Sequence, residues 1–100
     1  MVKLLEIKKS PNPTKKFRAA FMLDSGKIKH VDFGAAGYQD YTLTGDKDAR
    51  ARYQNRHVKD LETPNNRIGL GAGALSFYVL WGPHRSMSQN IMAYKKLFNL

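Results

Sequence analysis

The first third of the chain alternates between apolar and polar side chains, as half-buried strands do. Residues 2–9 alternate loosely, and residues 16–23 alternate more regularly, with four apolar side chains on one face: Phe17, Ala19, Phe21 and Leu23. Residues 24–27 have hairpin composition, because Gly26 tolerates positive φ, and residues 27–33 follow as a return strand. The pattern predicts a three-stranded antiparallel meander over about residues 2–33.

The rest of the chain has turn composition and helical periodicity. Residues 34–41 are expected to carry the chain off the sheet, and Thr44 and Asp46 to start a helix over residues 46–59, which lack Gly and Pro. Residues 61–73 are expected to form a loop. Residues 74–81 are apolar nearly all round, which predicts a short buried helix that ends at Gly82 and Pro83.

The clearest helix is expected at the C-terminal end. Ser86 and Gln89 fit a capping box. Apolar side chains then recur at helical spacing nearly to residue 100: Met87, Ile91, Tyr94 and Phe98. We therefore expect an α+β fold in a single domain over residues 1–100. Its antiparallel meander (about 2–33) is followed by three helices (about 46–100) packed on one face of the sheet.

Composition narrows the classes of function. The 100 residues include no Cys, which excludes disulfides, Cys-ligated zinc and iron–sulfur clusters. The longest apolar run, residues 72–81, is far shorter than the roughly 20 residues that cross a membrane. The first residues lack an apolar stretch typical of a signal peptide, so we expect a protein that is not secreted and not in a membrane.

Charge is the strongest signal. The chain has 17 Lys and Arg against 8 Asp and Glu, a net charge of +9. A small domain of this charge favours anionic partners, of which nucleic acid is the commonest polymer. The alternative is a merely soluble basic protein.

Two groups of cations are candidate nucleic-acid-binding residues. The predicted helix over residues 46–59 contributes Arg50, Arg52, Arg56 and Lys59. The N-terminal strands contribute Lys8, Lys9, Lys15, Lys16 and Arg18. Arginine grips phosphate with two hydrogen bonds, although many charged helices present only a solvated face. If the helix binds, its basic stripe (Arg52, Arg56 and Lys59, spanning about 10 Å) must face solvent, with Tyr53 turned toward the core.

Signals for chemistry are weaker. His30 and Asp32 have the spacing of two metal ligands on one strand face, but a structural role is the stronger interpretation. Asn55 and His57 on a helix after a hairpin faintly resemble ββα-metal nucleases, without a third ligand. The glycine-rich residues 69–73 are not followed by the Gly-Lys-Ser/Thr of a phosphate loop. We therefore interpret these glycines as residues that allow tight packing. We expect no catalytic residues, no metal and no cofactor.

Several multi-residue stretches carry a resemblance that spans roughly residues 15–100. They lie at 16–19, 31–34, 37–42, 46–57, 73–76, 79–81 and 94–100. This string resembles a family of small basic proteins of uncharacterised function encoded by large DNA viruses of algae and protists. The chain departs from that pattern at residues 65–70, where the family has a shorter turn containing Asp-Pro. The resemblance implies a viral context and gives no catalytic residues.

The combined expectation is a non-enzymatic viral protein that binds nucleic acid, DNA above RNA, with little sequence specificity. Its expected location is the virion or the infected cell. The alternative is a minor virion structural protein whose basic patches contact acidic surfaces of other virion proteins. The sequence does not indicate an oligomeric state.

Overall fold

The protein begins with the predicted antiparallel meander. The computed structural model describes residues 1–100 and contains β1 (Lys3–Lys9), β2 (Lys15–Met22) and β3 (Ile28–Ala35), in the order β1-β2-β3. Both neighbouring pairs are antiparallel. Gly26 sits in the β2–β3 turn with a φ of 86°, a conformation that costs glycine little. The prediction of strands from alternation is confirmed.

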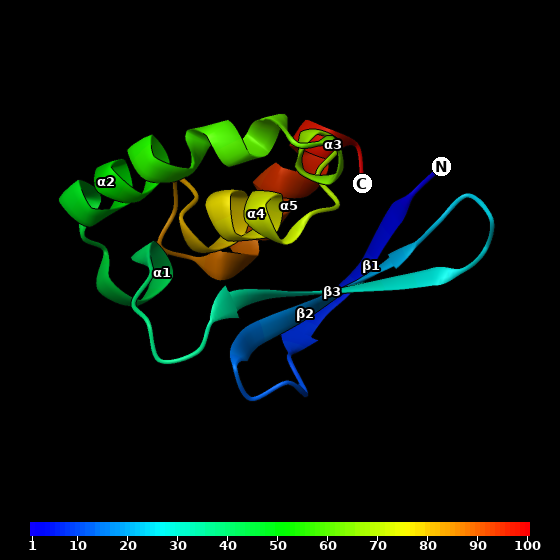
Figure 1. Cartoon of the computed structure of the whole chain (residues 1–100), viewed down its shortest axis with the longest axis horizontal. Coiled ribbons are helices and arrows are strands. Elements are labelled where there is room, and N and C mark those ends of the chain that lie inside the picture. Colours follow the sequence, from blue (N-terminus) through cyan, green and yellow to red (C-terminus); the bar gives the residue numbers. More distant parts are fainter.

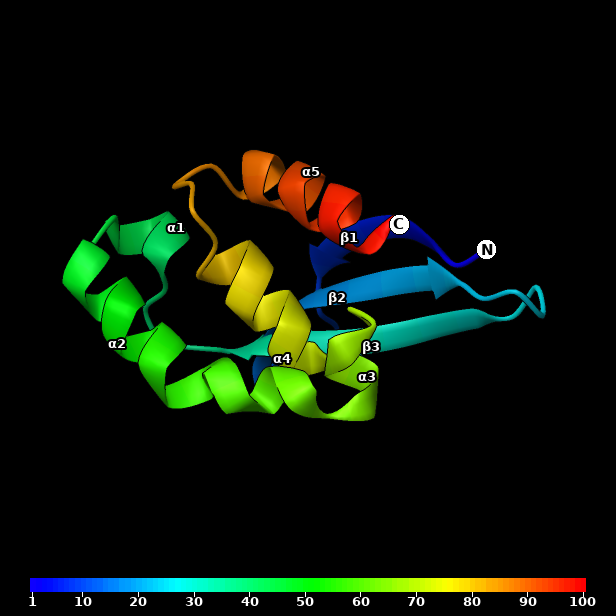
Figure 2. The same ribbon diagram turned by 90° about the horizontal axis from the view of Figure 1, so that it is seen from above.

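The helical segments follow the sheet, and those that cover it lie on one of its faces (Figure 1). In chain order they are α1 (Tyr41–Thr44), α2 (Lys47–His57), the 3₁₀ segment η1 (Val58–Glu62), α3 (Pro64–Arg67), α4 (Ala72–Leu75), the π-helical segment η2 (Ser76–Leu80) and α5 (Met87–Phe98). Figure 2 shows α1 and α2 beyond the end of β3, at the opposite end of the molecule from the β2–β3 turn. The predicted α+β class and one-sided packing are confirmed.

A β-bulge explains why alternation in the first strand is loose. The register between β1 and β2 shifts between Leu4 and Glu6, which leaves Leu5 exposed. Leu4 precedes the bulge and Ile7 follows it, and both side chains pack toward the core although they are three residues apart. One inserted residue reverses the facing of all later side chains in a strand, so a strict period of two does not fit β1.

The core lies between the sheet and the helices. Nine buried side chains form it: Leu4, Ala19, Phe21, Phe33, Leu70, Leu75, Val79, Leu80 and Tyr94. A fully buried aromatic or branched side chain contributes about 1.5–3 kcal/mol, so β2, η2 and α5 supply most of the cohesion. In α5, Tyr94 is buried and Met87, Ile91 and Phe98 pack against the core, which confirms the predicted apolar face.

The structure corrects the helix boundaries. The predicted turn over residues 34–41 is wrong at both ends, because β3 extends to Ala35 and α1 begins at Tyr41. A helix of one turn is too short to show periodicity; α1 exists because Asp40 caps its N-terminus and Gly45, with a φ of 65°, ends it. The predicted helix over residues 46–59 is α-helical only to His57, where the chain tightens into η1.

The predicted loop over residues 61–73 is also wrong in part. It contains α3, in which Pro64 occupies the first turn, the one place where a helix tolerates proline well. The buried helix begins at Ala72, two residues earlier than predicted, and widens into η2, where the Trp81 amide donates to the Ser76 carbonyl. At α5, Ser86 Oγ accepts from the Gln89 amide, which is one of the two hydrogen bonds of the predicted capping box.

Candidate nucleic-acid interface

Helix α2 is attached to the body by polar side chains and by one aromatic side chain, Tyr53. It has no buried residue. The Arg50 Nε donates to the carbonyls of Trp81 (3.0 Å) and Gly82 (2.9 Å), and its guanidinium lies 5.7 Å from the centre of the Tyr41 ring. These carbonyls follow the C-terminal end of η2, where positive charge is favourable. The predicted binding residue Arg50 is therefore half-buried and engaged in holding α2 in place.

The predicted basic stripe lies on the other side of α2. Arg52, Arg56 and Lys59 are all exposed, and none of them forms an ion pair. Tyr53 points inward and stacks on Trp81 with ring centres 4.4 Å apart and planes 7° from parallel. The stripe therefore has the orientation that binding requires, although Lys59 belongs to η1 and not to α2.

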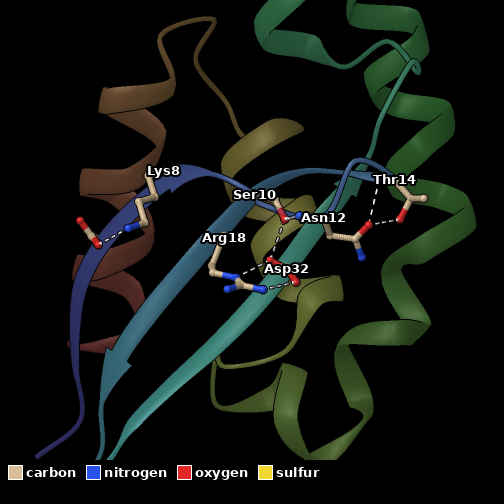
Figure 3. A network of polar contacts seen from close by, with 7 residues as sticks. Lys8, Ser10, Asn12, Thr14, Arg18 and Asp32 are labelled. Carbon is tan, nitrogen blue, oxygen red and sulfur yellow. Dashed lines mark hydrogen bonds and ion pairs between the residues drawn. The ribbon is translucent and has the colours of Figure 1, made fainter.

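The cations of the N-terminal strands separate into paired and unpaired groups. Figure 3 shows Arg18 beside Asp32 on the neighbouring strand, with Arg18 Nε and Nη2 donating to the two carboxylate oxygens at 2.8 and 3.0 Å. Ser10 Oγ also donates to this carboxylate, at 2.9 Å. Lys8 lies 3.4 Å from Glu6, an exposed pair. Lys9 and Lys15 are exposed and form no ion pair.

The Arg18 guanidinium determines the state of Asp32. Its hydrogen bonds stabilise the carboxylate and lower the pKa of Asp32 to about 2, and Ser10 adds to the shift. The same contact raises the pKa of Arg18. This pair contributes little net charge to the surface, so Arg18 is less available to a phosphate than sequence reasoning expects.

Lys16 also has a partner, which sequence reasoning missed. Its Nζ lies 2.6 Å from Asp40 Oδ2, and both side chains are largely buried. Asp40 also accepts from the Thr42 amide and so joins β2 to the start of α1. Gly34 permits this arrangement, because a Cβ there would lie 3.2 Å from Lys16 Cβ and 2.8 Å from a Leu80 methyl. An Asp preceding a short Tyr-Thr-Leu-Thr helix is a cap signal, but nothing local pairs it with Lys16.

The two basic groups meet at one cleft of about 690 Å³. It opens between the end of β3, the C-terminal part of α2 and the start of α4. Lys15 and Lys16 line one side, and Arg56 and His57 line another. Sequence reasoning placed these cations in separate patches, because only the tertiary fold brings residues 15 and 56 to the same cavity.

Aromatic side chains form part of the cleft. Trp81 and Tyr53 line it as a stacked pair, and His57 packs against Tyr53 with ring centres 4.3 Å apart and planes tilted by 32°. Burial raises the pKa of Tyr53, against the opposite effect of the Ser76 side chain nearby. His57 Nδ1 lies 2.8 Å from Asp60 Oδ2. Tyr38 also lines the cleft and is 73% exposed. Tyr38 was missed because it lies in a predicted turn.

The glycine-rich residues 69–73 serve packing. Asn66 Oδ1 accepts from the Ala74 amide at 2.9 Å, and its Nδ2 donates to the Asp60 carbonyl. A Cβ on Gly71 would lie 1.9 Å from Asn66 Oδ1, and one on Gly73 would lie 2.6 Å from Nδ2. The glycines let the Asn66 amide approach α4, as the packing interpretation predicted.

The sites considered for metal chemistry have other contacts. Asp32 is held by Arg18 and Ser10, and His30 is exposed beside it. His57 is paired with Asp60, and Asn55 is exposed. No group of three or more His, Cys, Asp or Glu side chains has a geometry that could hold a metal ion.

Comparisons with known proteins add a family assignment. None of the helices combines the length and apolar character needed to cross a membrane. No curated protein and no solved structure matches the chain. One family model matches residues 5–57, which include the sheet from residue 5 onward, α1, α2 and most of the residues that line the cleft. Since this match covers more than half of the chain, the protein belongs to the family of unknown function DUF5754.

Proposed function

We propose that this protein binds nucleic acid through phosphate contacts, with little sequence preference and without catalysis. One observation carries the proposal. Arg52, Arg56 and Lys59 are exposed and unpaired along α2 and η1, and Arg56 lines the cleft that Lys15 also lines. Several exposed, unpaired cations close together suit a polyanion, because each phosphate contact releases counterions.

Ion pairs narrow the set of candidate cations on the N-terminal strands. Arg18 and Lys16 are neutralised by Asp32 and Asp40, and Lys8 lies beside Glu6. The excess positive charge thus includes α2, η1 and the start of β2. Contacts to phosphate alone position a protein on nucleic acid without reading its sequence. We propose a viral context for this binding, on the basis of the resemblance to small basic viral proteins.

A salt titration of duplex DNA binding tests the proposal. Charge reversal of Arg52→Glu with Arg56→Glu should weaken binding to all sequences alike. It should also reduce the slope of log K against log salt by about two. The matched control is Lys95→Glu with Lys96→Glu, which changes the charge equally at two exposed positions of α5, a helix that does not line the cleft. The control should keep most of the slope.

The salt dependence of binding also distinguishes nucleic-acid binding from the alternative function, that of a structural protein that contacts acidic protein surfaces. Assembly through apolar contacts depends weakly on salt, whereas binding through several phosphates falls steeply. Unchanged DNA affinity in the folded Arg52/Arg56 double variant would reject the α2 surface as the binding site. Absence of DNA binding at physiological salt in the unmodified protein would reject the function.

A further inference from the structure

We propose that the cleft holds an unpaired nucleotide of a single strand, with its base on Tyr38 and its phosphate between Lys15 and Arg56. This inference rests on the proposed function and specifies the kind of nucleic acid: single strands should bind more tightly than duplex. The cleft volume of about 690 Å³ lies within the 300–1,000 Å³ typical of pockets that enclose small ligands.

Two of the cations that line the cleft form no ion pair with a carboxylate. Lys16 is bound to Asp40, and the Asp60 carboxylate faces His57. Lys15 and Arg56 have no carboxylate partner, although both line the cavity. They extend from different elements, β2 and α2, so an anion between them would be held from two sides. A phosphodiester carries a single negative charge and accepts the bidentate hydrogen bonds that arginine offers.

Tyr38 supplies a stacking surface at the same cavity. It is the most exposed of the large hydrophobic side chains in the protein, at 73%. A large aromatic ring left in water next to free cations is a common arrangement in proteins that bind single strands, because every base has a π-face. A base within a duplex is already stacked on its neighbours, so this contact favours unpaired bases.

A polar side chain at the cleft can satisfy a base edge. Gln39 lines the cavity, is exposed, and has an amide that both donates and accepts. The Gln39 amide can offer hydrogen bonds to any base, which agrees with binding that tolerates sequence.

The cleft and the stripe can act on one strand. Arg56 belongs to both, and Arg52 and Lys59 lie on the exposed side of the same helical segment, outside the cleft. A strand with one nucleotide in the cleft would therefore continue along α2 with its phosphates near these side chains.

Fluorescence provides a direct test, because Trp81 is the only tryptophan and lines the cleft. Titration with an oligothymidylate of about 10 nucleotides should change Trp81 emission, and a duplex of the same length should bind more weakly. Tyr38→Ala should weaken single-strand binding about tenfold and change duplex binding less than twofold. Lys15→Ala should also lower the affinity for the single strand, because it removes one of the two cations that hold the phosphate. The matched controls are Leu43→Ala, an exposed side chain of α1, and Lys96→Ala, both away from the cleft.

The possible results distinguish failure of the cleft proposal from failure of the proposed function. Tighter single-strand binding that depends on Tyr38 and Lys15, with unaffected controls, supports the cleft as the nucleotide site. Equal binding of single strand and duplex, unchanged by Tyr38→Ala, overturns this inference and leaves the proposed function standing. Equal competition by polyglutamate overturns the inference in favour of an acidic peptide. Absence of binding to any nucleic acid overturns both.

Discussion

Replacing Arg50 by alanine should separate the structural role of α2 from its binding role. The substitution removes a charged Nε–H donor shared by the carbonyls of Trp81 and Gly82, and a cation over the Tyr41 ring. A hydrogen bond to a charged group contributes about 1.5–3 kcal/mol, and an exposed cation–π contact adds about 0.5–1 kcal/mol. Because Arg50 is half-buried, water can replace part of this, and we expect a loss of about 2 kcal/mol.

Urea unfolding followed by the emission of Trp81 measures this loss. The midpoint should fall while the slope m stays unchanged, and the melting temperature should fall by roughly 10 °C. Arg52→Ala on the same helix is the control. It should change stability by no more than about 0.5 kcal/mol and should weaken DNA binding. Arg50→Ala should keep the DNA affinity of the folded protein. Equal stability of the two variants would refute the docking role of Arg50.

Three further predictions test other parts of the structure. By NMR, the carboxyl of Asp32 should titrate with a pKa of about 2, and this pKa should move toward the usual 3.8 in Arg18→Gln. Because the pKa is lowered in the folded state, the Asp32 carboxylate stabilises the fold fully above about pH 4, and this contribution is lost as the pH falls toward 2. Asn90→Ala should cost about 2–4 kcal/mol in urea unfolding, since the buried amide bonds three backbone groups, whereas exposed Asn55→Ala should cost under about 0.5 kcal/mol. Gly71→Ala should lower the melting temperature by at least several degrees, because the new Cβ would overlap the amide that caps α4; an unchanged melting temperature would contradict that packing.

Local patterns predicted the elements whose stability is local. Alternation in β2, a glycine in the hairpin turn and the recurrence of Met87, Ile91, Tyr94 and Phe98 are visible over a few residues, and the structure confirms all of them. The short helices α1 and α3 were missed, because each is a single turn held by a cap or a proline and has no period. The bulge at Leu5 was missed because its partner lies on another strand.

The candidate site shows the same limit. The exposed stripe could be predicted in large part, because α2 itself spaces Arg52 and Arg56, while Lys59 follows in η1. The cleft could not, because Lys15 and Arg56 are 41 positions apart and meet only through the packing of β2, β3 and α2. The neutralisation of Lys16 and Arg18 also depends on carboxylates from distant segments. The sequence shows how many cations the chain has, but only the fold determines which of them lack an ion-pair partner.

The attachment of α2 has a consequence for motion. Because this helix has no fully buried residue and Tyr53 on Trp81 is its main apolar contact, less apolar surface opposes its detachment than opposes opening of the core. Breaking a few directional contacts exposes its amides, whereas opening β2 would disrupt the core around Phe21. Amide hydrogens of α2 should therefore exchange with solvent deuterium through a local opening of low free energy, well before those of the sheet. The segment that carries the unpaired cations can therefore shift its position against a curved or irregular polyanion.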